Sequence, residues 1–184
     1  TSCTAQEECT SSTNTITAAA WASGGALSTK RYAVGGTGTQ TAGIAVGGTT
    51  FPITFVNATE EYGGASWTAG GNYPTTTSAT GLSGTQTAAV AFGGEPPPKG
   101  TATEEWNGNG AIGAWVTGAN MNTARQQAYG AGTQTAAIGA TGSTTANVAI
   151  TETWNGTSWA EVNDVNSPRR GVGSFGTSTA AIIT

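Results

Sequence analysis

The feature that most constrains the fold is a five-residue motif that occurs four times. The motif is Gly-Thr-Gln-Thr-Ala, with Ser in place of Gln in the last copy, and it begins at Gly38, Gly84, Gly132 and Gly176. A tryptophan precedes each of these glycines by 17 residues, at Trp21, Trp67, Trp115 and Trp159. Two features held at one offset in four copies indicate that the chain is built of repeats.

The spacing of the tryptophans predicts how the repeats are arranged. Successive tryptophans lie 46, 48 and 44 residues apart, and counting from Trp159 through the C-terminus and on from residue 1 to Trp21 gives 46 again. The 184 residues therefore make four periods of 46. An open solenoid has no reason to end at the phase at which it begins, and it usually carries atypical terminal repeats. We therefore expect a ring whose fourth unit is made from both ends of the chain.

Each period contains short runs of small or β-branched residues between glycines, which is typical of strands. The first period predicts strands at 30–34, 41–46, 51–62 and from residue 66 onward. The second and third periods repeat this order, with runs at 77–82, 87–92, 101–106, 125–129, 135–140 and 146–154. The last piece supplies only two strands, at 169–175 and 179–184, so residues 1–25 are expected to supply the other two.

Four short antiparallel strands in each period match the blade of a propeller. The predicted fold is all-β: a four-bladed β-propeller forming a single domain, closed by pairing of the N- and C-terminal strands. The blades are expected at about 26–71, 72–119, 120–163, and 164–184 joined with 1–25. Small residues suit the crowded inner strands of such a ring, and tryptophans on the outer strands, each burying roughly 150–250 Å², would fill the wider gaps between blades.

Composition excludes several classes of protein. The net charge is -4, only 9% of residues are charged, and the basic residues form no stripe, so nucleic-acid binding has no electrostatic footprint. No apolar run approaches the length of about 20 residues that a membrane-spanning helix needs. Low charge together with tryptophans at matched positions argues against disorder. The chain has no initiating methionine or signal peptide, so we expect a processed chain or one domain of a longer protein.

Two cysteines, Cys3 and Cys9, are the only thiols. Without histidine they cannot complete a tetrahedral metal site, so we expect neither a metal nor a cofactor. A local disulfide across a loop is favoured over free thiols, and redox chemistry is the least favoured reading. A disulfide here would indicate an oxidising, extracellular setting.

The residue types also argue against an enzyme. The chain contains no histidine, which excludes a Ser-His or Cys-His nucleophile pair. Carboxylates recur before the tryptophans, in Glu60-Glu61 and Glu104-Glu105 and as Glu152, with Asn14 at the matching place in the fourth unit. Adjacent strand residues face opposite sides, so neither pair converges as glycosidase acids do. We expect one glutamate to bond a neighbouring loop or blade and the other to lie in solvent.

Ten residues after the four tryptophans lie Arg31, Thr77, Arg125 and Arg169. In a ring, the three arginines would gather at one mouth of the axis. A guanidinium binds carboxylate or sulfate through two parallel hydrogen bonds, so one hypothesis is a site for an anion or an acidic glycan. The alternative is structural, with each arginine paired to a glutamate or a backbone carbonyl of the adjacent blade. Repetition in three of four units favours the structural role.

The pattern of Gly-Gly, then an aromatic residue, then tryptophan resembles the kelch family along the whole chain. The matching residues are Gly47-Gly48, Tyr62 and Trp67; Gly93-Gly94, Trp106 and Trp115; and Trp154 with Trp159, while Ala140-Thr141-Gly142 replaces one Gly-Gly. The resemblance implies a β-propeller. Galactose oxidase-like enzymes share it, but their copper site needs histidines, which this chain lacks.

The repeat style, rich in Thr and Ala and low in charge, also resembles the kelch-type repeats of bacteriophage virion and fibre proteins. This resemblance implies a non-enzymatic module on a virion surface or outside a cell, binding a host surface or other virion proteins. The alternative is a secreted, lectin-like propeller that binds a cell-surface glycan, with Tyr32, Tyr73 and Tyr129 able to stack on sugars or simply to pack. A propeller enzyme is the third possibility. No nucleic-acid partner and no membrane insertion are expected.

Overall fold

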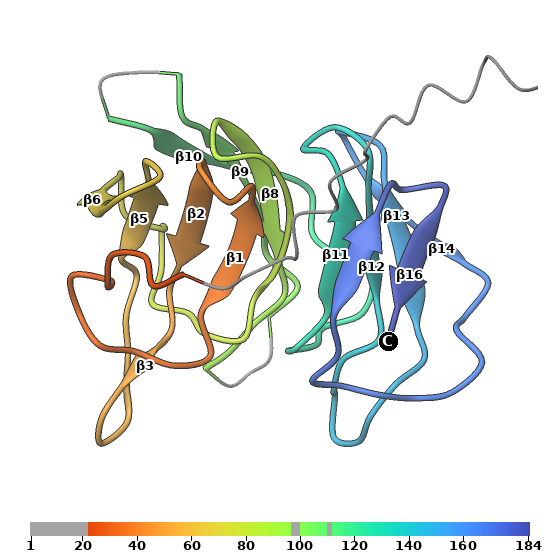
Figure 1. Ribbon diagram of the computed structural model, residues 1–184. Helices are drawn as coiled ribbons and strands as arrows, with labels where there is room; N and C mark the ends of the chain where they lie inside the picture. Colours follow the sequence, from red (N-terminus) through yellow and green to blue (C-terminus); the bar gives the residue numbers. More distant parts are fainter. Residues whose placement is uncertain (1–21, 97–99, 110–111) are drawn as a thin grey trace, which may run out of the picture.

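The protein is described by a computed structural model that covers residues 22–96, 100–109 and 112–184, and all structural statements here concern these residues. Every regular element in them is a β-strand, as predicted (Figure 1). The strands form three four-stranded antiparallel sheets and two two-stranded sheets. Cys3, Cys9, Asn14 and Trp21 lie outside the described residues, and so does the predicted pairing of the chain ends.

Each four-stranded sheet contains one repeat unit, with its strands in chain order from the inside outward. The first sheet contains β1 (Gly35–Gly38), β2 (Gly43–Val46), β5 (Thr59–Tyr62) and β6 (Trp67–Ala69). The second contains β7 (Gly81–Gly84), β8 (Ala88–Phe92), β9 (Thr103–Asn107) and β10 (Ala114–Thr117). The third contains β11 (Tyr129–Gly132), β12 (Ala137–Ala140), β13 (Thr151–Trp154) and β14 (Trp159–Val162). The fourth unit is represented by the hairpin of β15 (Ser174–Gly176) and β16 (Ala181–Ile183).

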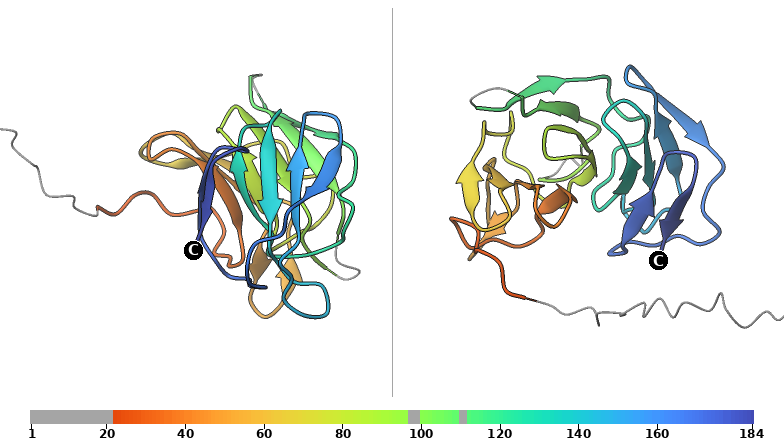
Figure 2. Two further views of the ribbon diagram at one scale, coloured as in Figure 1. Left: turned by 90° about the vertical axis from the view of Figure 1, so that its right-hand side faces the viewer. Right: turned by 45° about the horizontal axis from the view of Figure 1, so that its top comes forward.

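The sheets follow one another along an arc. Their first strands lie next to each other, because β1 contacts β7, β7 contacts β11, and β11 contacts β15. The right-hand view of Figure 2 shows the first sheet and the β15–β16 hairpin on either side of the open part of this arc. The described residues thus form a blade-like arrangement of sheets but not a closed ring.

The innermost strands begin later than the sequence predicted. The expected first strand at 30–34 is wrong, since β1 begins at Gly35. The cause is a residue in the left-handed region just before each inner strand: Ala33, Ala79, Gln127 and Gly171, with φ of 51°, 52°, 52° and 69°. An extended strand cannot pass through such a residue. The strands themselves are rich in glycine, which strand propensities disfavour, and a Cβ on Gly35 would lie 2.5 Å from Cδ1 of Leu82 on the next sheet.

A second correction concerns the expected strand at 51–62. The structure divides this segment into the end of a small hairpin, β3 (Thr49–Thr50) with β4 (Thr54–Phe55), and the separate strand β5. The hairpin tip is apolar and open to solvent, with Phe51 92% and Ile53 72% exposed. Pro52 at the tip cannot donate to a strand ladder, which fits a turn better than a long strand.

The repeated motif forms the turn between the first and second strands of each unit. Its glycines have positive φ, from 113° to 123°, and a Cβ on any of them would lie 2.2–2.3 Å from the carbonyl oxygen of the motif's alanine. In all four copies, the amide of the threonine that follows the glycine donates to this same carbonyl oxygen. Only glycine fits this position, which explains why the motif always begins with it.

The glutamine of the motif links neighbouring sheets. Gln86 Nε2 donates to the carbonyl oxygen of Tyr62 on the first sheet at 2.8 Å, and Gln134 Nε2 donates to that of Trp106 on the second sheet at 2.9 Å. Outer tryptophans make a second link. Trp115 Nε1 donates to Thr59 Oγ1 at 3.1 Å, and Trp159 Nε1 donates to Thr103 Oγ1 at 2.9 Å.

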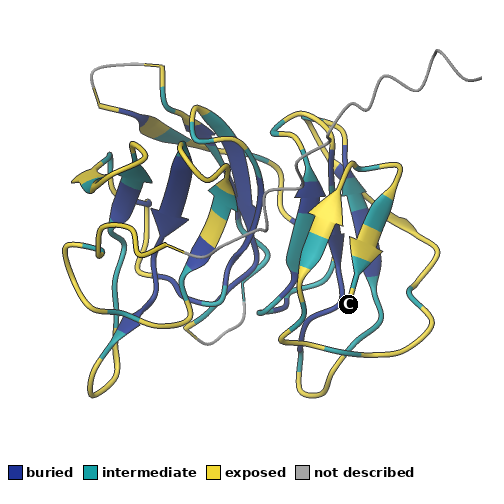
Figure 3. Ribbon diagram, viewed as in Figure 1, coloured by how far each residue is buried: buried dark blue, intermediate teal, exposed yellow. Residues whose placement is uncertain are grey.

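The core lies between the sheets, and β8 shows this directly. Ala89 and Ala91 belong to the cluster shared with the first sheet, whereas Val90 and Phe92 belong to the cluster shared with the third. All four side chains are fully buried. Figure 3 shows the contrast with the β15–β16 hairpin, whose strands carry no buried residue. The second sheet is therefore covered on both faces, which explains its run of apolar residues without polar alternation.

Candidate binding site

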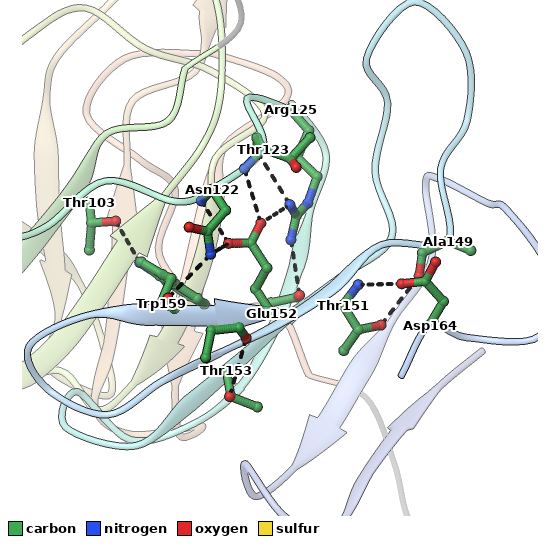
Figure 4. A network of polar contacts seen from close by, with 12 residues as sticks. Thr103, Asn122, Thr123, Arg125, Ala149, Thr151, Glu152, Thr153, Trp159 and Asp164 are labelled. Atoms are coloured by element: carbon green, nitrogen blue, oxygen red, sulfur yellow. Dashed lines mark hydrogen bonds and ion pairs between the residues drawn. The ribbon is translucent and has the colours of Figure 1, made fainter. Parts of the chain in front are cut away.

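A buried ion pair forms the polar centre of the third unit (Figure 4). Arg125 and Glu152 pair through Nη1 and Oε1, and neither side chain has any exposed surface. Glu152 also accepts hydrogen bonds from the amides of Asn122 at 2.7 Å and Thr123 at 3.3 Å, and Arg125 Nη2 donates to the carbonyl oxygen of Gly139 at 3.1 Å. The pair ties the segment before β11 to the middle of the sheet.

The first unit has the same arrangement. Arg31 Nη2 lies 2.8 Å from Glu60 Oε1, and the amide of Ser28 donates to Glu60 Oε2 at 2.8 Å. Arg31 Nη1 donates to the carbonyl oxygen of Ala58 at 3.4 Å. Burial lowers the pKa of Arg31, and the negative charge of Glu60 acts in the opposite direction. Glu60 and Arg31 thus form a structural pair inside one sheet.

The second unit keeps the carboxylate but lacks its partners. Glu104 is only 6% exposed, yet Thr77 stands where the other units have arginine. Pro74 stands where Ser28 and Asn122 donate their amides, and proline has no N–H to donate. Among the described residues, the hydroxyl of Thr117 donates a hydrogen bond to the Glu104 carboxylate at 2.9 Å. Burial raises the pKa of Glu104, and the hydrogen bond from Thr117 only partly offsets this.

Replacement of Glu104 by glutamine is expected to raise the thermal midpoint at pH 7. Because the pKa of Glu104 is higher in the folded chain than in the unfolded chain, stability falls as the pH rises from the unfolded pKa through the folded pKa, and the full penalty remains above it. Below the unfolded value, about 4.3, the carboxyl is protonated in both states and the gain should vanish. Thermal melts of Glu104→Gln from pH 4 to pH 7 test this, with the exposed Glu161→Gln as the control. A gain that grows toward low pH would contradict it.

A cavity of ≈ 320 Å³ lies in the same unit. Tyr73, Thr75, Thr77, Gly94, Glu95 and Ala102 are among its lining residues. Tyr73 is 3% exposed, its ring packs edge-on against Trp115 at 4.9 Å, and its hydroxyl has no hydrogen-bond partner among the described residues. Burial raises the pKa of Tyr73, and the negative charge of Glu104 raises it further.

A larger cavity of ≈ 730 Å³ lies among the inner strands. Residues of β1, β7, β11 and β15 line it, together with Tyr62 and Trp67 on the outer part of the first sheet. None of its lining side chains is charged. Tyr129 lines this cavity, whereas Tyr32 is 55% exposed on the surface and Tyr73 is a buried packing residue.

The structure separates Arg31 and Arg125, which are buried in ion pairs, from Arg169, which is half-buried and contacts a backbone carbonyl. Arg31 and Arg125 have fully buried side chains in ion pairs, so neither guanidinium faces solvent. The structural alternative therefore describes these two positions, although their glutamates lie in the same unit and not in the adjacent blade. Arg169 is half-buried and donates from Nε to the carbonyl oxygen of Ser167 at 3.3 Å. Asn14, which stands at the glutamate position of the fourth unit, lies outside the described residues.

The sequence predicted that the repeated glutamates are structural, but it did not predict that Glu104 lacks the arginine partner that Glu60 and Glu152 have. The expectation that one member of each pair bonds a nearby loop is confirmed for Glu60, and Glu61 is only partly exposed. The signal for the second unit was present, because aligning the repeats places both Pro74 and Thr77 at positions where the other units supply hydrogen-bond donors. The signal is a change of residue type at the two repeat positions that contact the carboxylate in the first and third units.

Comparison with protein-family models finds no match for this chain, and comparison with curated proteins finds none. Within the residues that the structure describes, no helix is long and apolar enough to cross a membrane. The same part of the chain contains no group of three or more His, Cys, Asp or Glu side chains arranged to hold a metal ion.

Proposed function

We propose that this chain is a four-bladed, kelch-like β-propeller that acts as a non-enzymatic binding module, displayed outside a cell or on a virus particle. The observation that carries the proposal is how the repeated polar residues are used. Gln86, Gln134, Arg31 and Arg125 all bond within or between sheets. A rigid scaffold built from repeats, with variable residues left for loops and cavities, is suited to recognition.

The proposal includes closure of the ring by residues 12–21. Trp67 matches Trp115 and Trp159, whose indoles bond a threonine of the preceding sheet, and the matching threonine for Trp67 is Thr13. Trp67 Nε1 instead donates to the carbonyl oxygen of Gly25 at 3.1 Å. The fourth unit also has an open apolar face, where Phe175 and its cross-strand partner Ile182 are 59% and 56% exposed. Strands added beside this hairpin would cover that surface.

Replacement of Gln40 by alanine tests ring closure. Gln134→Ala should lower the free energy of unfolding by about 0.5–1.5 kcal/mol, since it removes the inter-sheet hydrogen bond to Trp106. If Ile16 occupies the place that Tyr62 and Trp106 hold in the other units, Gln40→Ala should cost the same. Urea unfolding measures both variants. Ser178→Ala is the control, because its short side chain cannot make this link, and a Gln40→Ala variant as stable as that control would argue for an open ring.

Display on a particle is tested by locating the chain. We expect it to co-purify with virion proteins in fixed stoichiometry, and antibodies raised against it should decorate intact particles in electron microscopy. Support comes only from the resemblance of the repeats and the low-charge composition. Turnover of a substrate by the purified chain, or its exclusion from particles and from the cell exterior, would contradict the proposal.

A carbohydrate-binding role is the second candidate, favoured by the uncharged cavity that Tyr129 lines. An aromatic ring can stack on the apolar face of a sugar while threonine hydroxyls and backbone groups bond its hydroxyls. Glycan-array binding lost in Tyr129→Ala but kept in the exposed Tyr32→Ala would favour this role. Arg125→Ala is unsuitable as a probe because that side chain is buried.

A further inference from the structure

The second unit contains a buried carboxylate, Glu104, that has no cationic partner among the described residues. We propose that the cavity lined by Tyr73, Thr77 and Glu95 binds a guanidinium group supplied from outside the chain, with Glu104 as its carboxylate partner. The guanidinium is either the side chain of an arginine on a partner protein or a small free guanidinium compound. The first and third units hold their own guanidinium against the equivalent carboxylate. The proposal does not depend on where the protein is displayed.

The hydrogen-bond acceptors for such a group lie at the cavity. In the first unit, Arg31 Nη1 donates to the carbonyl oxygen of Ala58, two residues before Glu60. In the third, Arg125 Nη1 donates to the carbonyl oxygen of Thr123, two residues before the arginine itself. The counterparts in the second unit are Ala102 and Thr75, and both line the cavity. The repeat therefore places the same backbone positions around an unfilled space.

In the second unit, the cavity is lined by the counterparts of the residues that the arginine side chain contacts in the first unit. In the first unit the arginine passes over a glycine, since a Cβ on Gly48 would lie 3.3 Å from Arg31 Cδ. The counterpart of Gly48 is Gly94, where an added Cβ would lie 2.7 Å from the short Thr77 side chain. Gly94 and Thr77 both line the cavity. The cavity has a volume of ≈ 320 Å³.

Charge and unmet hydrogen bonds favour a cation in this space. The ion pairs of the described residues use Arg31 and Arg125, so neither Glu104 nor the cavity-lining Glu95 has a cationic partner there. The buried hydroxyl of Tyr73 also lacks a partner among the described residues. An unpaired buried carboxylate is costly, and a planar guanidinium with five donors can satisfy a carboxylate and nearby oxygens together.

Binding of methylguanidinium and of the capped peptide Gly-Arg-Gly to the full chain, measured by calorimetric titration and thermal shift, tests the proposal. We expect saturable binding that weakens by about tenfold or more in Glu104→Gln. Thr77→Arg should also abolish binding and raise the thermal midpoint without ligand, since it supplies the guanidinium internally. Thr157→Arg, at an exposed turn of the third sheet, adds the same charge and should leave binding unchanged.

The two probes distinguish the sources. Equal affinity for both assigns the site to a small guanidinium compound, whereas tighter binding of the peptide assigns it to a partner's arginine. Lys99 lies outside the described residues, so Lys99→Gln is included. Binding that appears only in Lys99→Gln would overturn the proposal, because the chain would then supply its own cation. Equal binding of methylammonium, unchanged binding in Glu104→Gln and Thr77→Arg, or no saturable binding of either probe would also overturn it.

Discussion

Replacement of Arg125 by methionine should lower the free energy of unfolding by about 3–5 kcal/mol, the usual cost of leaving a buried charge without its partner. Methionine keeps much of the aliphatic volume, so the loss comes mainly from stranding Glu152, which has no exposed surface. The carbonyl oxygen of Gly139 also loses its guanidinium donor. Urea unfolding at pH 7, followed by tryptophan fluorescence, measures the effect.

The double variant Arg125→Met with Glu152→Gln separates charge from packing. Glutamine carries no charge and keeps one oxygen that can accept from the amide of Asn122, while the position that accepts from the amide of Thr123 becomes an NH2 group. The double variant should therefore be more stable than Arg125→Met alone. Arg170→Met, at an exposed position, is the control and should change stability by no more than about 0.5 kcal/mol. A loss below 1 kcal/mol in Arg125→Met would mean that the pair is dispensable.

The sequence predicted four antiparallel strands in chain order for the first three units because the repeats align on their glycines and tryptophans. It placed the first inner strand too early because the residue before it, Ala33, adopts a left-handed conformation that alanine rarely shows. The glycine-rich run that follows has low strand propensity in isolation. Close approach of β1 and β7 around the axis favours glycine there, and that is a tertiary effect.

For the candidate sites, the sequence showed which polar residues repeat but not which residues they contact. The motif glutamine was visible as a repeated residue, but its acceptor lies on another sheet, 24 residues earlier in the case of Gln86 and Tyr62. The structural alternative for the arginines placed their partners in the adjacent blade, whereas Arg31 and Arg125 pair with glutamates of their own unit. The cavity that Thr77 lines depends on the volume that this short side chain leaves unfilled, and an unfilled volume has no sequence signature of its own.

Loss of the Trp106 side chain should be the most damaging change in the apolar core. Trp106 is fully buried, its ring centre lies 5.2 Å from that of Trp115, and Nε1 donates to the carbonyl oxygen of Gln86 at 2.7 Å. Two glycines fit closely against the ring, because a Cβ on Gly113 would lie 2.0 Å from Cζ2 and one on Gly70 3.0 Å from Cη2. Trp106→Ala should cost about 3–5 kcal/mol, since it opens a cavity that this backbone cannot readily collapse to fill.

Trp106→Phe distinguishes the contribution of the ring from that of the hydrogen bond. Phenylalanine keeps most of the packing but leaves the Gln86 carbonyl without its indole donor, so the expected cost is about 1–3 kcal/mol. Tyr62→Ala is the matched control, because Tyr62 occupies the same repeat position in the first sheet but is only partly buried. Its cost should be well below that of Trp106→Ala. Equal costs would mean that burial between the first and second sheets does not determine stability, contrary to the continuous core through β8.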